Sequence, residues 1–227
     1  MRAALEDDYH HFRVTVRHAA GRVTEVTAQS PRHPWTMCPQ AADRLPEFVG
    51  ADLMEAAKAA AITDPRFQCT HMYDLSCLAI AGATRAPGRR RYEVAVADRP
   101  RHGSTTATLT RDGEVLWTWE VDGAEVVGPE RFAGLSLKRP FADWIARNLS
   151  PDEAEAAIVL RRGIFISNGR RDLDQFDRVP MPVGGCITLQ PGRIENTFRM
   201  KGSSLDFTDR PQALTEDDQD WLAFAGD

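Results

Sequence analysis

The sequence predicts an α+β protein in which an antiparallel sheet carries helices on one side. Two observations predict this class. Segments that alternate apolar and polar residues occur in an N-terminal hairpin and in a later meander, and apolar helical stretches lie between and after them. A barrel-like closure of the strands would fit the same pattern. We expect residues 1–227 to form a single domain.

The N-terminal hairpin is predicted from two alternating runs, residues 10–18 and residues 23–28, joined by a glycine-containing turn. His10 and His18 stand at the two ends of the apolar side of the first run, and His11 stands on its polar side. We therefore expect one buried face on this strand.

The segment after the hairpin, residues 30–39, contains three prolines and is expected to be irregular, because proline removes a backbone donor. Short helices are predicted over residues 41–49 and 52–61. A longer apolar helix is predicted from Thr70, as its N-cap, to about residue 85.

The meander is predicted from four alternating runs separated by glycine turns. They are residues 92–97, 105–110, 114–121 and 124–127. The third run carries the heaviest apolar face, formed by Val115, Trp117, Trp119 and Val121. This face suits either a core or a pocket wall.

The most clearly marked helix of the chain begins at Ser150, because a serine N-cap, a proline and then Glu153 form a capping box. We expect this helix to run from Pro151 to about Phe165. The other elements expected nearby are a helix ending at residue 148, a flexible loop over 170–182, a hairpin pairing 186–190 with 194–200, and a terminal helix over 216–224.

Composition excludes several partners. Of the 227 residues, 42% are hydrophobic and 27% charged, and the formal net charge is −5. Without a concentrated basic face, nucleic acid is not an expected partner. Apolar runs are too short to span a membrane, and the acidic N-terminus does not resemble a secretory signal. We expect a cytoplasmic protein whose four cysteines are thiols or metal ligands, and the sequence permits a homodimer.

The stretch from Gln68 to Leu75 gathers most of the reactive side chains. It places Cys69 just ahead of the predicted helix, and it puts His71 and Asp74 three residues apart on one helical stripe. A thiol, an imidazole and a carboxylate in so short a span make this the candidate site.

Four motifs in a fixed order resemble a bacterial family known as domain of unknown function 2889. They are Tyr9-His10-His11-Phe12, His33-Pro34-Trp35-Thr36-Met37-Cys38-Pro39, Gln68-Cys69-Thr70-His71-Met72-Tyr73-Asp74-Leu75 and Leu160-Arg161-Arg162-Gly163-Ile164-Phe165-Ile166-Ser167. Members of this family are frequent in actinobacteria and sphingomonads, often in settings of aromatic or steroid breakdown. The resemblance implies small-molecule catabolism and marks Cys38, Cys69 and His71 as recurring positions.

Three interpretations of these residues remain open. In the first, Cys38, Cys69 and His71 bind zinc or iron, and the fourth ligand is Asp74, a hairpin histidine or water. With water there, the site is open and can activate water or a carbonyl. In the second, Cys69 is a nucleophile activated by the helix N-terminus, with His71 or His18 as its base, or His71 and Asp74 form an acid–base pair. In the third, all of these side chains are structural.

The sequence thus favours a lyase or hydrolase acting on an aromatic or steroid-like small molecule. We expect catalysis by His71 and Asp74, a metal held by Cys38, Cys69 and His71, and no nucleotide cofactor, since the glycine pattern of dinucleotide sites is absent from the sequence. The alternative is a non-catalytic accessory, regulatory or ligand-binding protein. The sequence does not assign definite roles to His10, His11, His18, Cys77 and Cys186.

Overall fold

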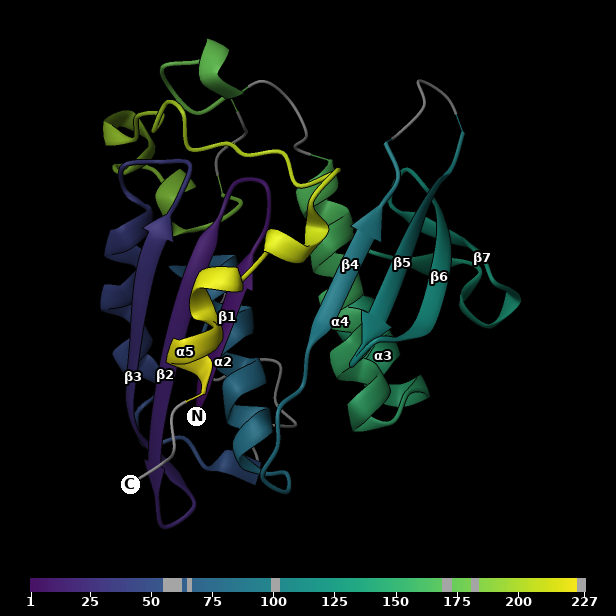
Figure 1. The fold of residues 1–227 in the computed structure, drawn as a ribbon, viewed down its shortest axis with the longest axis horizontal. Coiled ribbons are helices and arrows are strands. Elements are labelled where there is room, and N and C mark those ends of the chain that lie inside the picture. Colours follow the sequence, from purple (N-terminus) through teal and green to yellow (C-terminus); the bar gives the residue numbers. More distant parts are fainter. Residues whose placement is uncertain (55–62, 65–66, 99–102, 169–172, 181–183, 224–227) are drawn as a thin grey trace. The chain divides into compact units, whose positions relative to one another are not determined.

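The computed structural model describes residues 1–54, 63–64, 67–98, 103–168, 173–180 and 184–223. Its contacts divide the chain into two compact units (Figure 1). Unit 1 combines Met1–Ala86 with Asp172–Asp227, and unit 2 is Pro87–Arg171. That residues 1–227 fold as a single domain stays a prediction.

Unit 1 is built on a three-stranded antiparallel sheet with the order β1-β2-β3. Its strands are β1 (Arg2–Glu6), β2 (His11–Ala19) and β3 (Arg22–Arg32). The predicted hairpin is confirmed as β2 and β3, and the alternation of β2 buries Phe12, Val14 and Val16 completely. β1 was not predicted. It extends the sheet by pairing Glu6 with His11 and Arg2 with Thr15.

Both faces of this sheet are covered. Helix α2 (Thr70–Ala83) contacts β1 and β2 on one face, and the short helix α5 (Gln219–Leu222) contacts β1 (Figure 1, with α2 behind the strands and α5 in front). The C-terminal segment on the second face explains why the expected exposure of His11 was wrong. His11 was placed on a polar side, but it is only 6% exposed because the C-terminal segment lies over it.

The segment between β3 and α2 folds as the 3-10 helix η1 (Cys38–Phe48), which contacts β3. It occupies most of the predicted helix 41–49, and it is a 3-10 helix that begins with Cys38-Pro39 and contains Pro46. The expectation of an irregular segment over 30–39 was too broad, since β3 continues to Arg32. Most of the helix predicted over 52–61 lies outside the described residues.

The C-terminal part of unit 1 consists of short turns. They are η4 (Leu173–Gln175), η5 (Ile187–Leu189), η6 (Ile194–Asn196), η7 (Pro211–Ala213) and η8 (Glu216–Asp218). The hairpin predicted over 186–200 is therefore wrong: the Ile187 N–H donates to Gln68 O at 3.1 Å instead of to a partner strand. The predicted terminal helix is confirmed in place as η8 and α5. The ends of the predicted flexible loop 170–182 lie outside the described residues.

Unit 2 is the predicted meander. Its sheet runs in chain order through β4 (Tyr92–Val96), β5 (Thr105–Arg111), β6 (Glu114–Asp122), β7 (Glu125–Gly128) and β8 (Leu135–Ser136). The other elements are η3 (Glu130–Phe132), α3 (Phe141–Asn148) and α4 (Pro151–Ser167). α4 packs closely on β4, because a Cβ added at Gly163 would lie 2.4 Å from Val94 Cγ1.

The predicted apolar face of β6 is confirmed for three of its four residues. Trp119 and Val121 are fully buried and Trp117 packs against the same core, whereas Val115 is 63% exposed. The pairing of β5 with β6 shifts between Leu109 and Thr110, and such a bulge reverses which side chains face the core.

The α+β class with antiparallel sheets is confirmed, although the strands form two sheets of three and five strands where a single sheet was expected. Among the described residues, none of the helices has both the length and the apolar character needed to cross a bilayer.

Candidate functional site

A four-residue loop, residues 7–10, joins β1 to β2, and the side chain of Asp7 holds it closed. The Asp7 Oδ1 atom accepts hydrogen bonds from the Tyr9 N–H at 2.7 Å and from the His10 N–H at 2.9 Å. The Asp7 N–H donates to the His10 carbonyl at 2.9 Å. Aspartate commonly closes turns in this way, and here the bonds fix the carboxylate in position.

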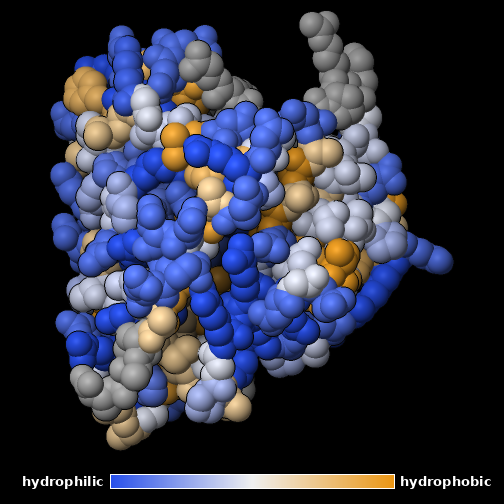
Figure 2. Space-filling view, in the orientation of Figure 1, coloured by the Kyte–Doolittle hydropathy of each residue, from blue (hydrophilic) through white to orange (hydrophobic). Residues whose placement is uncertain are grey.

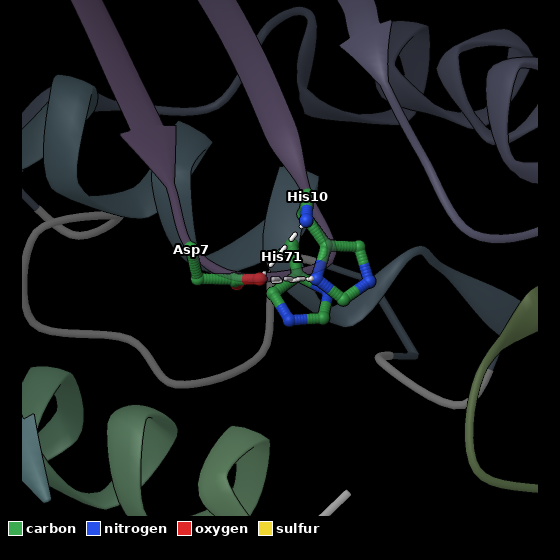
Figure 3. Close-up of side chains that lie close together, drawn as sticks. All are labelled: Asp7, His10 and His71. Carbon is green, nitrogen blue, oxygen red and sulfur yellow. Dashed lines mark hydrogen bonds and ion pairs between the residues drawn. The ribbon is translucent and has the colours of Figure 1, made fainter. Parts of the chain in front are cut away.

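The imidazole of His10 turns back onto the same carboxylate (Figure 3). Its Nδ1 atom lies 3.0 Å from Oδ1 and 3.1 Å from Oδ2 of Asp7. Since a carboxylate only accepts hydrogen bonds, Nδ1 carries the proton in this contact, and the neutral ring presents Nε2 as its basic atom. The side chains of His10 and Asp7 are 14% and 16% exposed, so solvent reaches the pair.

His71 comes to this pair from the first turn of α2. The ring centroids of His71 and His10 lie 4.0 Å apart with 31° between the ring planes. Phe12, which is fully buried, lies beneath both imidazoles, with its centroid 6.0 Å from His71 and 5.4 Å from His10. Two strands, a loop and a helix therefore bring two imidazoles and a carboxylate together over an apolar floor.

The predicted start of α2 was off by one residue. Cys69, in an extended conformation, is the N-cap, and Thr70 is the first helical residue. The Cys69 side chain makes no capping hydrogen bond. Threonine is the more usual capping residue, which is why the sequence favoured Thr70.

The groups around Asp7 lower the pKa of its carboxyl. Burial acts to raise the pKa of Asp7, but the positive charge and hydrogen bond of His10, the charge of His71 and the Tyr9 N–H outweigh it. The result is a pKa lowered from 3.8 to about 2. Asp7 is therefore ionised at neutral pH.

Within the described part of the chain, one group of three potential metal ligands has all its ligand atoms within 4.8 Å of one another: Asp7, His10 and His71. The predicted set of Cys38, Cys69 and His71 does not meet this distance. Of the predicted ligands, the structure thus brings only His71 to this group.

The predicted thiols gather elsewhere in unit 1. Cys38 and Cys69 are 6% and 7% exposed. Burial raises the pKa of the Cys38 thiol well above its ordinary value, and nearby Cys69 and then Cys186 raise it further. None of the four cysteines, all of which lie in the described part of the chain, forms a disulfide. A raised pKa favours the neutral thiol of Cys38, which is a poorer nucleophile than a thiolate.

Asp74, the second predicted catalytic residue, lies one turn further along α2. Its charge acts on Cys77, whose pKa is raised to about 12 by burial first and by Asp74 second. The pairing of Asp74 with His71 in catalysis stays a prediction.

A second buried histidine–carboxylate contact has a structural explanation. His11 Nε2 lies 2.9 Å from both carboxylate oxygens of Asp218, which is completely buried and also bonded by Arg13. Asp218 ends η8, so these bonds attach the C-terminal segment to β2.

Unit 2 contains a separate cavity of about 140 Å³ that includes none of the predicted site residues. It is lined by Arg111, Leu116, Trp117, Asp152, Glu153 and Ala156. Its charged side chains already pair with one another or with neighbouring arginines, since Asp152 bonds Arg111 and Arg90. These contacts are typical of a stabilising ion-pair network.

Sequence reasoning missed Asp7 and considered His10 only as one of the hairpin histidines that could supply a fourth metal ligand. The signal that could have found them is the Asp-x-x-His spacing of residues 7–10 between two pairing strands, but β1 was not recognised. Without β1, residues 7–10 do not form a hairpin loop and Asp7 has no defined position.

Residues 3–84 match the model of a family described as a protein of unknown function (DUF2889). This match confirms the resemblance over the N-terminal part, which includes Asp7, His10 and His71. The motif from Leu160 to Ser167 lies outside the matched residues. No curated protein and no solved structure is significantly similar to the chain.

Proposed function

We propose that this protein is a small-molecule enzyme, a lyase or hydrolase, whose proton-transfer centre is formed by Asp7, His10 and His71. The observation that carries the proposal is the contact of His10 Nδ1 with both oxygens of the Asp7 carboxylate, at 3.0 and 3.1 Å. A carboxylate that accepts the Nδ1 proton of an imidazole fixes the tautomer and the orientation of the ring, so that Nε2 faces a substrate as the proton acceptor.

His71 supplies the second proton-handling group. A hydrolysis needs one group to take a proton from water and one to give a proton to the leaving group, and a lyase needs the same two roles on one substrate. The rings of His10 and His71 are close enough for each to sense the other's charge. Asp7 stabilises a positive charge on either ring, so the pair can hold the transferred proton during the reaction.

The surroundings suit such chemistry. The buried Phe12 ring beneath both imidazoles lowers the local dielectric constant, which strengthens the attraction between Asp7 and a protonated histidine. The side chains of His10 and Asp7 keep 14% and 16% of their surface exposed, so the pair is not sealed from solvent.

The proposed substrate is an aromatic or steroid-like compound, supported by the catabolic settings in which the resembling family occurs. The proposed location is the cytoplasm, supported by four cysteines that form no disulfide, since a reducing compartment keeps cysteines as thiols.

The second candidate is a non-catalytic accessory or ligand-binding protein. One observation favours it: Oδ1 of Asp7 closes the loop through two backbone N–H groups, which is a structural role that needs no reaction. A broad apolar surface is expected of an interaction protein. The face in Figure 2 is instead mostly hydrophilic, with apolar side chains in small separate patches.

The test is turnover by the full chain of a panel of aromatic and steroid-like esters, amides and hydroxy acids, followed by mass spectrometry for gain or loss of water. We expect conversion of at least one compound class, with rates about 10²- to 10⁴-fold lower in His10→Gln and His71→Gln. His18→Gln is the control, because His18 is exposed at the far end of β2.

Two results would contradict the proposal that this protein is an enzyme acting through this centre. Unchanged turnover in both His10→Gln and His71→Gln would show that these histidines do not take part in the reaction. Compounds that raise the melting temperature without being converted would support the ligand-binding candidate instead.

A further inference from the structure

We propose that Asp7, His10 and His71 together bind one divalent transition-metal ion of the zinc or iron(II) class. The inference concerns the same centre as the proposed function and rests on it for the ion's catalytic role, but binding itself can be measured without a substrate. Two imidazoles and one carboxylate are a donor set that suits these ions and leaves further coordination positions open for water or substrate.

The distances fit a shared ion. Bonds of about 2.1 Å place neighbouring ligand atoms about 3.0 Å apart in an octahedral site and about 3.4 Å apart in a tetrahedral one. His10 Nδ1 lies 3.1 Å from Asp7 Oδ2, and the chosen atoms of all three residues lie within 4.8 Å of one another. Only small movements of the side chains are therefore needed to place one ion among them.

The two carboxylate oxygens of Asp7 can have different roles: one holds the loop and the other is available to an ion. Oδ1 accepts the backbone N–H groups of Tyr9 and His10, which hold the loop. The hydrogen bond that Oδ2 accepts comes from His10 Nδ1, and an ion would replace the proton in that contact. Metal binding through Oδ2 thus leaves the loop closed, so the position of the ligand does not depend on the ion.

The near-parallel rings support the same arrangement. Imidazoles whose centroids are 4.0 Å apart with 31° between planes can present their nitrogen edges on one side (Figure 3). His10 is fixed by the loop and His71 by the first turn of α2, so the backbone already holds both ligands in place. Such preorganisation lowers the cost of forming the site.

This site differs from the thiolate site expected from the sequence. The absorption spectrum of bound cobalt(II) distinguishes the two, because it depends on whether the ligands include thiolates. The full chain is freed of metal with a chelator and titrated with Co²⁺, then with Zn²⁺ in competition. We expect one Co²⁺ per chain, with visible d–d absorption and without the near-ultraviolet thiolate-to-cobalt charge-transfer band.

Variants identify the ligands. His71→Ala and His10→Ala are expected to weaken Co²⁺ binding at least about 100-fold. His18→Ala, and a double variant with Cys38→Ala and Cys69→Ser, are expected to bind as the parent does. Circular dichroism and melting curves verify that each variant is folded, and His71→Gln, which keeps the side-chain size, replaces His71→Ala if the latter does not fold.

Two outcomes would overturn the inference: no stoichiometric binding by the folded parent, or a charge-transfer band that disappears in the cysteine variant. Neither decides the proposed function. Turnover lost in His10→Gln without metal binding would mean a metal-free centre, whereas metal binding without turnover would leave the ion in a non-catalytic protein.

Discussion

Two helix starts in this molecule are built in opposite ways. α4 begins with a complete capping box: Ser150 Oγ accepts the Glu153 N–H at 3.3 Å, and Glu153 Oε2 accepts the Ser150 N–H at 3.0 Å. Asp152 adds a second carboxylate in the first turn and pairs with arginines. α2 begins at Cys69, without a side-chain cap and without an acidic residue in its first turn.

The negative charge near the first turn of α2 comes from outside the helix, from Asp7 in the β1–β2 loop. The partners of the two carboxylates also differ. Asp152 pairs with arginines, whose guanidinium groups are permanent cations, while Asp7 contacts the imidazole of His10 and lies beside that of His71. The start of α4 follows every local rule for stability. The start of α2 departs from them where ionisable groups converge, which is typical of a functional site.

The largest effect on stability is expected for Asp7→Asn, measured by urea unfolding of metal-free protein. The pKa of Asp7 falls from 3.8 in the unfolded chain to about 2 in the folded one, and a shift of this size corresponds to about 2 kcal/mol. Because the folded pKa is lowered, the contribution is complete above pH 3.8 and is lost as the pH falls through about 2.

Asp7→Asn should therefore lower the free energy of unfolding by about 1–3 kcal/mol at neutral pH. The stability of the variant should also lack the decrease that Asp7 protonation causes in the parent at acid pH. Asp209→Asn is the control, since it removes the same charge from an exposed position in unit 1. An Asp7→Asn variant whose stability declines in parallel with the parent between those pH values would show that Asp7 gains nothing from its histidine neighbours.

A smaller effect is expected at the capped helix. Ser150→Ala removes the acceptor for the Glu153 N–H and should lower the free energy of unfolding of unit 2 by about 1 kcal/mol. Thr70→Ala is the matched change at α2, where Thr70 is not the cap, and should cost less than about 0.5 kcal/mol. If Thr70→Ala costs as much as Ser150→Ala, the two helix starts do not differ as described.

The same contrast explains what the sequence could predict. The capping box and the meander depend on residues near one another in the chain, so Ser150 and the Asp112-Gly113 turn were sufficient to locate α4 and the β5–β6 hairpin. β1 was missed because Arg2-Ala3-Ala4-Leu5-Glu6 lacks the β-branched and aromatic residues of typical strands. Residues 186–200 contain such residues, yet they form turns because Ile187 bonds to Gln68.

The candidate site was predictable only in part for the same reason. His71 was identified from its own motif, and its partners Asp7 and His10 lie about 60 residues earlier, in a loop that exists only because β1 pairs with β2. Cys69 and His71 are two residues apart, but one is extended and the other helical, so their side chains reach different neighbours. Their two-residue spacing in the sequence could not show that the side chains of Cys69 and His71 reach different neighbours.

The smallest effect tests whether α2 lacks only a capping atom. Cys69→Ser places a hydroxyl at the N-cap, where it can accept one of the backbone N–H groups of the first turn, and Cys69→Ala removes the sulfur without offering an acceptor. Urea unfolding should show Cys69→Ser to be more stable than Cys69→Ala by about 0.5 kcal/mol, at the low end for such caps because the site is only 7% exposed. Equal stabilities would mean that no N–H group is within reach of residue 69. Because His71 is positioned by the helix backbone, both variants should bind Co²⁺ as the parent does, and weaker binding in both would show that the sulfur helps to hold the first turn of α2.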